Sequence, residues 1–162
     1  MTDVTITALP AAPLHVFEIW SKPSTVASRF EAALGRSLPV LGRALQLPAM
    51  RLIRYEPAVW LVDGDPAGLA EILGADGSVT AIGGGVVRVR ISGAAWRSLL
   101  MEGGVFNAES TDFAAGSSAT TLIDHVNVRL YVESLDACLA YVPLSYARDM
   151  IHFWTVAAKS LV

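Results

Sequence analysis

The sequence of 162 residues is rich in apolar side chains and poor in charge. Ala, Val, Ile, Leu, Met, Phe, Trp, Tyr and Cys make up 53 per cent of it, and 17 per cent is charged. Soluble domains usually carry ~25 per cent charged residues, whereas disordered chains combine low hydrophobicity with high charge. The composition therefore excludes a disordered chain, and the length predicts one compact unit that can contain two lobes.

Composition and charge exclude several partners. No apolar run approaches the ~18 residues of a membrane-spanning helix, and the net charge of −3 argues against the basic stripe of a nucleic-acid binder. The single cysteine cannot form an internal disulfide. The N-terminus lacks the basic region and long apolar core of a secretory signal. We therefore expect a cytoplasmic protein with no nucleic-acid partner and no membrane partner.

Residues 1–82 predict an N-terminal α+β lobe with the element order βαββαβ. A leader broken by prolines ends near Pro13. The predicted elements are a strand over 14–20, a helix up to Gly35, a loop over 36–48 with one helical turn at 40–46, strands over 50–55 and 58–62, a short helix ending at Gly74, and a strand over 79–82. Apolar spacings of three and four residues indicate the helices, and β-rich apolar runs indicate the strands.

Residues 83–162 predict a C-terminal α+β lobe. Its expected elements are an alternating strand over 87–91, a helix ending at Leu100, a loop over 102–117, a hairpin of 120–123 and 126–132 around Asp124-His125, a strand over 137–142, and a helix over 143–161. Ala147, Ile151, Trp154, Ala158 and Leu161 give that last helix one apolar stripe. Together the halves predict an α+β fold of two ferredoxin-like βαββαβ-type lobes that share or abut one sheet.

No set of residues has the spacing of a metal site or of a nucleophile with its base. His15, His125 and His152 are scattered, and no Cys/His cluster is present. We interpret His125 as a hairpin-tip residue, His152 as solvated on the polar helix face, and His15 as a core histidine bonded to the backbone. Cys138 alternates with apolar residues, as a small buried hydrophobe would. The prediction is therefore no catalytic residue and no metal ligand.

Three small-residue and acidic motifs have simple structural interpretations. Gly83–Gly85 precedes a strand, so a hairpin turn fits it better than a dinucleotide loop. Ser92-Gly93 lies between a strand and a helix, where backbone amides could hold an anion, but a tight capping turn is favoured. Asp63 and Asp65 occupy positions suited to capping the following helix.

A series of motifs over residues 58–160 resembles a known family. It comprises the strand and turn Arg88–Gly93, the helix Trp96–Leu100, Phe113 and Gly116 in a small-residue loop, Thr120–Leu122, the hairpin strand Val126–Leu130, and Tyr141–Ala147 before the last helix. In order and spacing it resembles the gamma subunit of heterotetrameric sarcosine oxidase. That subunit is similar to the folate-binding domain of aminomethyltransferases such as the glycine-cleavage T protein. The chain departs from the family pattern at 103–107 and at Leu144.

The resemblance implies a non-catalytic accessory subunit with an aminomethyltransferase-like fold. Its partners would be the larger flavin- and folate-binding subunits of an amine oxidase complex. In such a complex FAD, FMN, NAD and tetrahydrofolate belong to those partners, which oxidatively demethylate sarcosine and pass the one-carbon unit to tetrahydrofolate. No cofactor is expected on this chain. An accessory subunit should expose a contiguous apolar patch, rimmed by Trp or Tyr, when isolated.

Two alternatives remain open at this stage. The chain could be a stand-alone binder of folate-type small molecules, with Arg88 and Arg90 on the polar face of their strand pairing with a glutamate tail. Ordinary surface charge is the simpler interpretation of both arginines. It could also form a homo-oligomer through a self-complementary apolar surface, which would require no partner protein.

Overall fold

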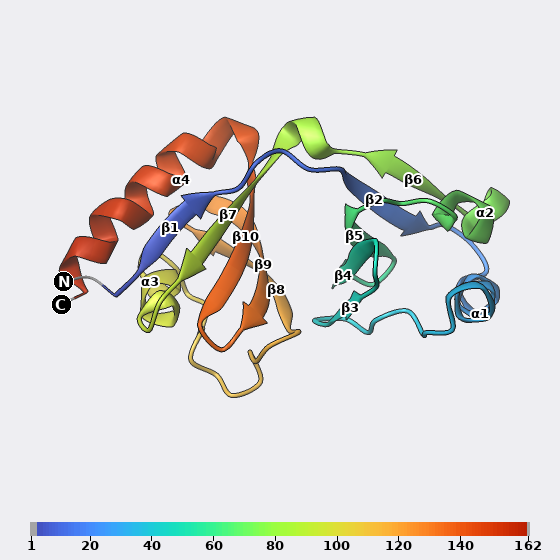
Figure 1. Ribbon diagram of the computed structural model, residues 1–162, viewed down its shortest axis with the longest axis horizontal. Helices are drawn as coiled ribbons and strands as arrows, with labels where there is room; N and C mark the ends of the chain where they lie inside the picture. The colour runs from blue at the N-terminus through green and yellow to red at the C-terminus, as the bar shows by residue number, and fades with distance from the viewer. Residues whose placement is uncertain (1–2, 162) are drawn as a thin grey trace. The chain divides into compact units, whose positions relative to one another are not determined.

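The computed structural model describes residues 3–161, which form two units, each with its own five-stranded antiparallel sheet (Figure 1). Unit 1 contains the described residues up to Ala11 together with those from Gly84 onward. Unit 2 contains Ala12–Gly83. The predicted division into residues 1–82 and 83–162 is therefore wrong for the N-terminal residues, which belong with the second half of the chain.

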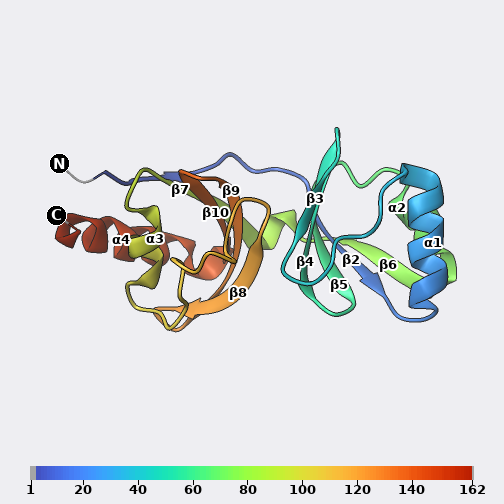
Figure 2. The same ribbon diagram turned by 90° about the horizontal axis from the view of Figure 1, so that it is seen from below.

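Unit 2 is a ferredoxin-like sheet with one added edge strand. Its elements are β2 (Leu14–Ile19), α1 (Pro23–Leu34), β3 (Ala44–Gln46), β4 (Met50–Glu56), β5 (Val59–Gly64), α2 (Leu69–Leu73), the 3-10 turn η1 (Gly74–Asp76) and β6 (Gly77–Ala81). The strand order is β3-β4-β5-β2-β6. Without β3, this is the interleaved order in which each helix crosses over one strand, as in a split βαβ fold. Figure 2 shows α1 and α2 side by side next to the sheet.

Helix α1 begins and ends where the sequence predicts. Pro23 stands in its first turn, where its missing N–H is no loss. Gly35 ends it with a φ of 66°, and its N–H donates to the Glu31 carbonyl. Val26 and Phe30 are fully buried on its inner face, and Phe30 packs edge-on against Phe17 of β2. The apolar stripe therefore fixes which side of α1 faces the sheet.

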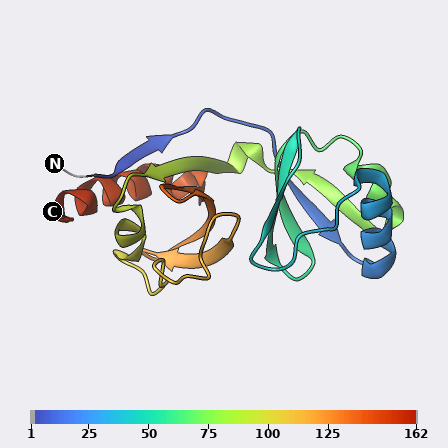
Figure 3. The same ribbon diagram turned by 60° about the horizontal axis from the view of Figure 1, so that its bottom comes forward.

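Unit 1 consists of a curved sheet and two helices. Its elements are β1 (Thr5–Ala8), β7 (Val86–Ser92), α3 (Trp96–Met101), β8 (Ser118–Ile123), β9 (Val126–Ser134), β10 (Ala137–Pro143), α4 (Leu144–Ala157) and the 3-10 turn η3 (Ala158–Ser160). The strand order is β1-β7-β10-β9-β8, so the last three strands form a meander (Figure 3). The predicted order of helices and strands after residue 83 is confirmed.

One apolar core holds unit 1 together. The inward residues of β7, including Val89 and Ile91, join Trp96 of α3 and Trp154 of α4 in a single cluster. Helix α4 lies against β1, β7 and β10. Its buried residues, which include Met150 and Trp154, lie on the predicted apolar stripe or beside it. The 3.6-residue period therefore identified the packing face of this helix correctly.

Three local predictions are wrong. β1 replaces part of the expected proline-broken leader, because residues 5–8 pair with β7 in the register Thr5↔Ser92 to Ala8↔Val89. The expected helical turn at 40–46 is instead the short strand β3, which pairs with β4. Gly83–Gly85 forms a 3-10 turn, η2, rather than a hairpin, because the strands it joins belong to different sheets. The two units therefore have separate sheets and do not share one.

Within residues 3–161, no helix is both long and apolar enough to cross a membrane.

Candidate functional site

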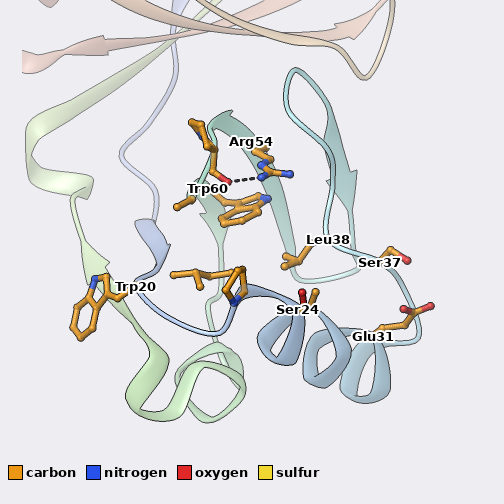
Figure 4. Close-up of a pocket in the computed structure, with 12 residues that line it drawn as sticks. Trp20, Ser24, Glu31, Ser37, Leu38, Arg54 and Trp60 are labelled. Carbon is orange, nitrogen blue, oxygen red and sulfur yellow. Dashed lines mark hydrogen bonds between the residues drawn. The ribbon is translucent and has the colours of Figure 1, made fainter.

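A groove in unit 2, with a cavity volume of about 710 Å³, is the candidate site (Figure 4). The end of β2, one face of α1, the turn between β4 and β5, and the loop that follows α1 enclose it. Its lining residues are Ile19, Trp20, Pro23, Ser24, Ala27, Glu31, Ser37, Leu38, Arg54, Pro57, Ala58 and Trp60. The volume lies within the range of ~300–1,000 Å³ that is typical of ligand sites, and most of the lining is apolar.

Trp60 forms the inner wall of this groove and is held on several sides. Its indole N–H donates to the Pro39 carbonyl over 3.2 Å, and Phe17 packs edge-on at 5.6 Å between ring centroids. The Arg54 guanidinium lies over the indole, 4.7 Å from the ring centroid, and donates to the Pro57 carbonyl, a contact drawn in Figure 4. Only 3 per cent of Trp60 is exposed. Arg54 and Trp60 are thus a fixed part of the wall.

Helix α1 supplies the opposite wall. Ser24, Ala27 and Glu31 recur at intervals of three and four residues, which places them on one helix face. Glu31 is exposed, and within residues 3–161 its carboxylate has no hydrogen-bond or ion-pair partner. Trp20 stands at the rim with 64 per cent of its surface exposed. The groove therefore combines an exposed indole with an unpaired carboxylate.

A buried carboxylate, Asp76, fixes the backbone that carries Trp20. The Asp76 backbone carbonyl accepts from the N–H groups of Trp20 and Ser21 at 2.7 and 3.2 Å. Its carboxylate accepts from the Ser21 hydroxyl at 2.7 Å and from the Arg29 guanidinium at 2.6 Å. The hydrogen bond from Ser21, then that from Arg29, hold the pKa of Asp76 below its ordinary value of 3.8. The chain between β2 and α1 is thereby fixed in place.

The polar groups of this groove are few. Its lining contains two serines, one carboxylate and one guanidinium, with neither His nor Cys to act as a base or a strong nucleophile. Across residues 3–161, no group of three or more His, Cys, Asp or Glu side chains is placed to hold a metal ion.

The two arginines of the folate-type alternative lie in unit 1, outside this groove. Arg90 forms a bidentate ion pair with Glu133, at 2.7 and 3.0 Å, which raises the pKa of the arginine. Arg88 donates to the Pro10 carbonyl over 2.9 Å. Each guanidinium is thus engaged with a group of its own chain, and a folate tail would have to displace or share those contacts.

The histidines and the cysteine are placed almost as predicted. His125 is exposed in the β8–β9 turn with a φ of 65°, and His152 is exposed on α4. Cys138 is fully buried, and the loss of solvation raises the pKa of its thiol. His15 differs from its prediction: its Nδ1 is buried without a hydrogen-bond partner in the described part of the chain, so the expected bond to the backbone is wrong.

The Ser92-Gly93 turn is tight, as predicted, but it does not cap the helix: the N-cap of α3 is Ala95, without a side-chain hydrogen bond. Gly93 has a φ of 112°, and a Cβ there would lie 2.1 Å from the Asp3 carbonyl oxygen. The Asp3 carboxylate accepts from the Ala94 N–H at 3.3 Å. Asp65 accepts from the Ala67 N–H at 3.0 Å in the turn before α2. The N-cap of α2 is Gly68 without a side-chain hydrogen bond, so the predicted capping by Asp63 or Asp65 is wrong. Side chains and carbonyls of this same chain therefore occupy these amides.

The sequence did not predict this groove. Its lining comes from four separate segments between Ile19 and Trp60, and no motif connects them. One signal was available, because Trp20 follows the apolar strand directly and precedes a polar break at Ser21-Lys22. A tryptophan at such a boundary belongs to the rim of a core rather than to its centre.

Comparison with known proteins defines the fold class first. No family model and no curated protein matches this sequence. Among solved structures, however, the two-sheet α+β arrangement is that of the aminomethyltransferase-like fold, which confirms the fold predicted from the sequence.

Two solved structures carry that assignment. A chain of the heterotetrameric sarcosine oxidase from Corynebacterium sp. U-96, in complex with pyrrole 2-carboxylate, matches with a TM-score of 0.85 at 19 per cent identity, over 97 per cent of this chain and 84 per cent of that one. The glycine cleavage system aminomethyltransferase T from Bartonella henselae matches with a TM-score of 0.70 at 14 per cent identity, over 94 per cent of this chain. This chain spans only 45 per cent of that aminomethyltransferase.

Proposed function

We propose that this chain is a non-catalytic accessory subunit of a sarcosine oxidase-like amine oxidase complex, equivalent in role to a gamma subunit. One observation carries the proposal. The similarity to a chain of a heterotetrameric sarcosine oxidase covers nearly all of both chains, 97 and 84 per cent, whereas less than half of the aminomethyltransferase is covered.

The absence of a catalytic constellation supports the same role. Among the described residues the candidate site is a groove without a nucleophile-base pair, and the only cysteine is buried. In the proposed cytoplasmic complex, the larger subunits hold FAD, FMN, NAD and tetrahydrofolate and carry out the demethylation of sarcosine with one-carbon transfer to tetrahydrofolate. This chain contributes surface that stabilises the assembly.

Co-expression tests the proposal directly. The chain is expressed together with affinity-tagged large subunits of a sarcosine oxidase-type complex from the same genome, and the purified material is analysed by light scattering coupled to gel filtration. We expect one complex that contains this chain in stoichiometric amount and loses thermal stability when the chain is left out. If the chain elutes alone and the large subunits assemble equally well without it, the accessory role is refuted.

One observation favours the folate-type alternative: the chain shares its fold with an aminomethyltransferase, at a TM-score of 0.70. Titration of tetrahydrofolate against the isolated chain by calorimetry examines it. Saturable binding at micromolar concentration that weakens in Arg88→Ala or Arg90→Ala would support a small-molecule role. We expect no saturable binding, because both guanidinium groups already bond within the chain. The same gel filtration measures self-association and so tests the homo-oligomer alternative.

A further inference from the structure

The groove of unit 2 leaves apolar surface open to solvent. Trp20 is 64 per cent exposed at its rim. The loop that contributes Leu38 to the lining continues to Val40 and Leu41, which are 63 and 55 per cent exposed. The Gly42 N–H donates to the Arg54 carbonyl, so this loop stays next to the groove. Large exposed apolar side chains gathered around one concave site indicate an interaction surface.

The openness of the lining favours a polypeptide as occupant. Several lining residues, including Pro23, Ser24, Pro57 and Ala58, are exposed. Buried ligand sites cover about 70–90 per cent of a small molecule, but a molecule here would keep one side in water. An extended segment that belongs to a larger protein would leave less of its surface in water, because the rest of that protein covers the side of the segment that faces away from the groove. Figure 4 shows the labelled side chains spread along the groove rather than converging on one point.

The charged residues of the lining indicate which side chains such a segment would carry. Glu31 and Arg54 are the charged residues of the lining. Arg54 already lies over Trp60 and donates to backbone carbonyls, whereas the Glu31 carboxylate has no partner within residues 3–161. An anionic lipid surface would be repelled by Glu31, and a basic side chain would be attracted.

We infer that this groove is the docking site for an extended apolar segment of a larger subunit, with a Lys or Arg of that segment opposite Glu31. The inference rests on the proposed accessory role and goes beyond it by assigning the surface and the chemistry of the partner. Trp20 acts as the anchor residue, since tryptophan is enriched among the few residues that dominate interface energies. Glu31 sets the register of the segment through its charge.

The experiment measures binding of the full chain to the purified large-subunit assembly by biolayer interferometry. Trp20→Ser and Glu31→Arg are compared with Leu135→Ser and Glu102→Arg, which change an exposed apolar residue and an exposed carboxylate outside the groove. We expect both groove variants to raise Kd at least about tenfold and both controls to stay within about twofold. In Glu31→Gln, the salt dependence of Kd should fall. Circular dichroism and the thermal midpoint verify that each variant is folded.

The outcomes separate the two proposals. If the wild-type chain does not bind the large subunits, the accessory role is refuted and the docking site is refuted with it. If the wild type binds and both groove variants bind equally well, the accessory role stands and the docking site is refuted. If gel filtration shows a wild-type dimer that Trp20→Ser dissociates, the groove is a self-association face, which also overturns the assignment.

Discussion

Arg97 is the side chain that holds the long loop between α3 and β8, and its replacement by Ala makes a sharp test of the packing in unit 1. One guanidinium nitrogen donates to the Ala108 carbonyl and, over 2.8 Å, to the Phe113 carbonyl. The guanidinium also lies 4.2 Å from the ring centroid of Trp96. A single residue on α3 thus connects two points of the loop to the helix.

The expected loss of stability follows from these contacts. Hydrogen bonds from a charged donor contribute ~1.5–3 kcal/mol each, and the half-exposed position of Arg97 favours the lower end of that range. Stacking on Trp96 adds ~0.5–1 kcal/mol, while the rotamer freedom that the arginine loses on folding offsets ~1–2 kcal/mol. We therefore expect Arg97→Ala to lower the free energy of unfolding by about 1.5–3 kcal/mol. With ~1–3 kcal/mol per molar urea as the slope, the midpoint falls by about 1 M.

Urea denaturation and hydrogen exchange measure this effect at two levels. Tryptophan fluorescence follows global unfolding, and exchange resolved by mass spectrometry follows the amides of residues 102–117. The control is Arg148→Ala, which removes an exposed arginine from α4 in the same unit. Arg97→Lys keeps the charge but loses the planar fork, so it should restore only part of the stability. A loss below about 0.5 kcal/mol in Arg97→Ala, within the usual range of surface substitutions, would refute the reasoning.

Three further changes have definite expectations. Asp76→Asn should lower the free energy of unfolding at neutral pH. Because the folded-state pKa of Asp76 lies below 3.8, the stabilisation by its carboxylate is present above about pH 4 and is lost as pH falls through that lowered pKa. On acidification the urea midpoint of the variant should therefore fall less than that of the wild type. Cys138 is buried with a raised thiol pKa, so a thiol reagent at about pH 8 should label it only after denaturation; rapid native labelling would contradict its burial. Gly77→Ala places a Cβ 2.0 Å from the Glu18 carbonyl oxygen, whereas Gly84→Ala meets nothing within 4 Å; thermal melts should show a loss of about 1–3 kcal/mol for the first and little change for the second, and equal melts would refute the packing argument.

The parts of the fold that the sequence predicted are those with a strong local period. Helix α4 is one, since its apolar stripe repeats over four turns and coincides with the buried side chains Met150 and Trp154. Helix α1 is another, with Gly35 at a left-handed φ just where the helix stops. Strand β7 alternates inward Val89 and Ile91 with outward arginines. In each case the signal lies within one segment, so neighbouring residues suffice to detect it.

The misplaced elements depend on partners that are distant in sequence. Residues 5–8 become β1 only because β7, more than eighty positions later, offers its edge, and nearby prolines obscured the short strand. β3 has three residues and is defined by its pairing with β4. The groove could not be predicted from the sequence for the same reason, because its lining residues come from separate segments. Trp20 and Trp60 line the same groove because β2 lies beside β5 in the sheet, an order that no local pattern encodes.

The burial of the tryptophans changes what the apolar composition means. Trp60, Trp96 and Trp154 are each 3 per cent exposed or less. They belong to two separate cores, one in each unit. Each core supplies interior positions for large apolar side chains, so part of the apolar content lies inside the two units. Trp20 is the one tryptophan of this chain left exposed, and it stands at the rim of the groove. Of the nine exposed large apolar side chains among the described residues, three, Trp20, Val40 and Leu41, lie at the groove or in the loop beside it, and the other six lie in unit 1. The groove is therefore one exposed apolar surface at which association can be tested.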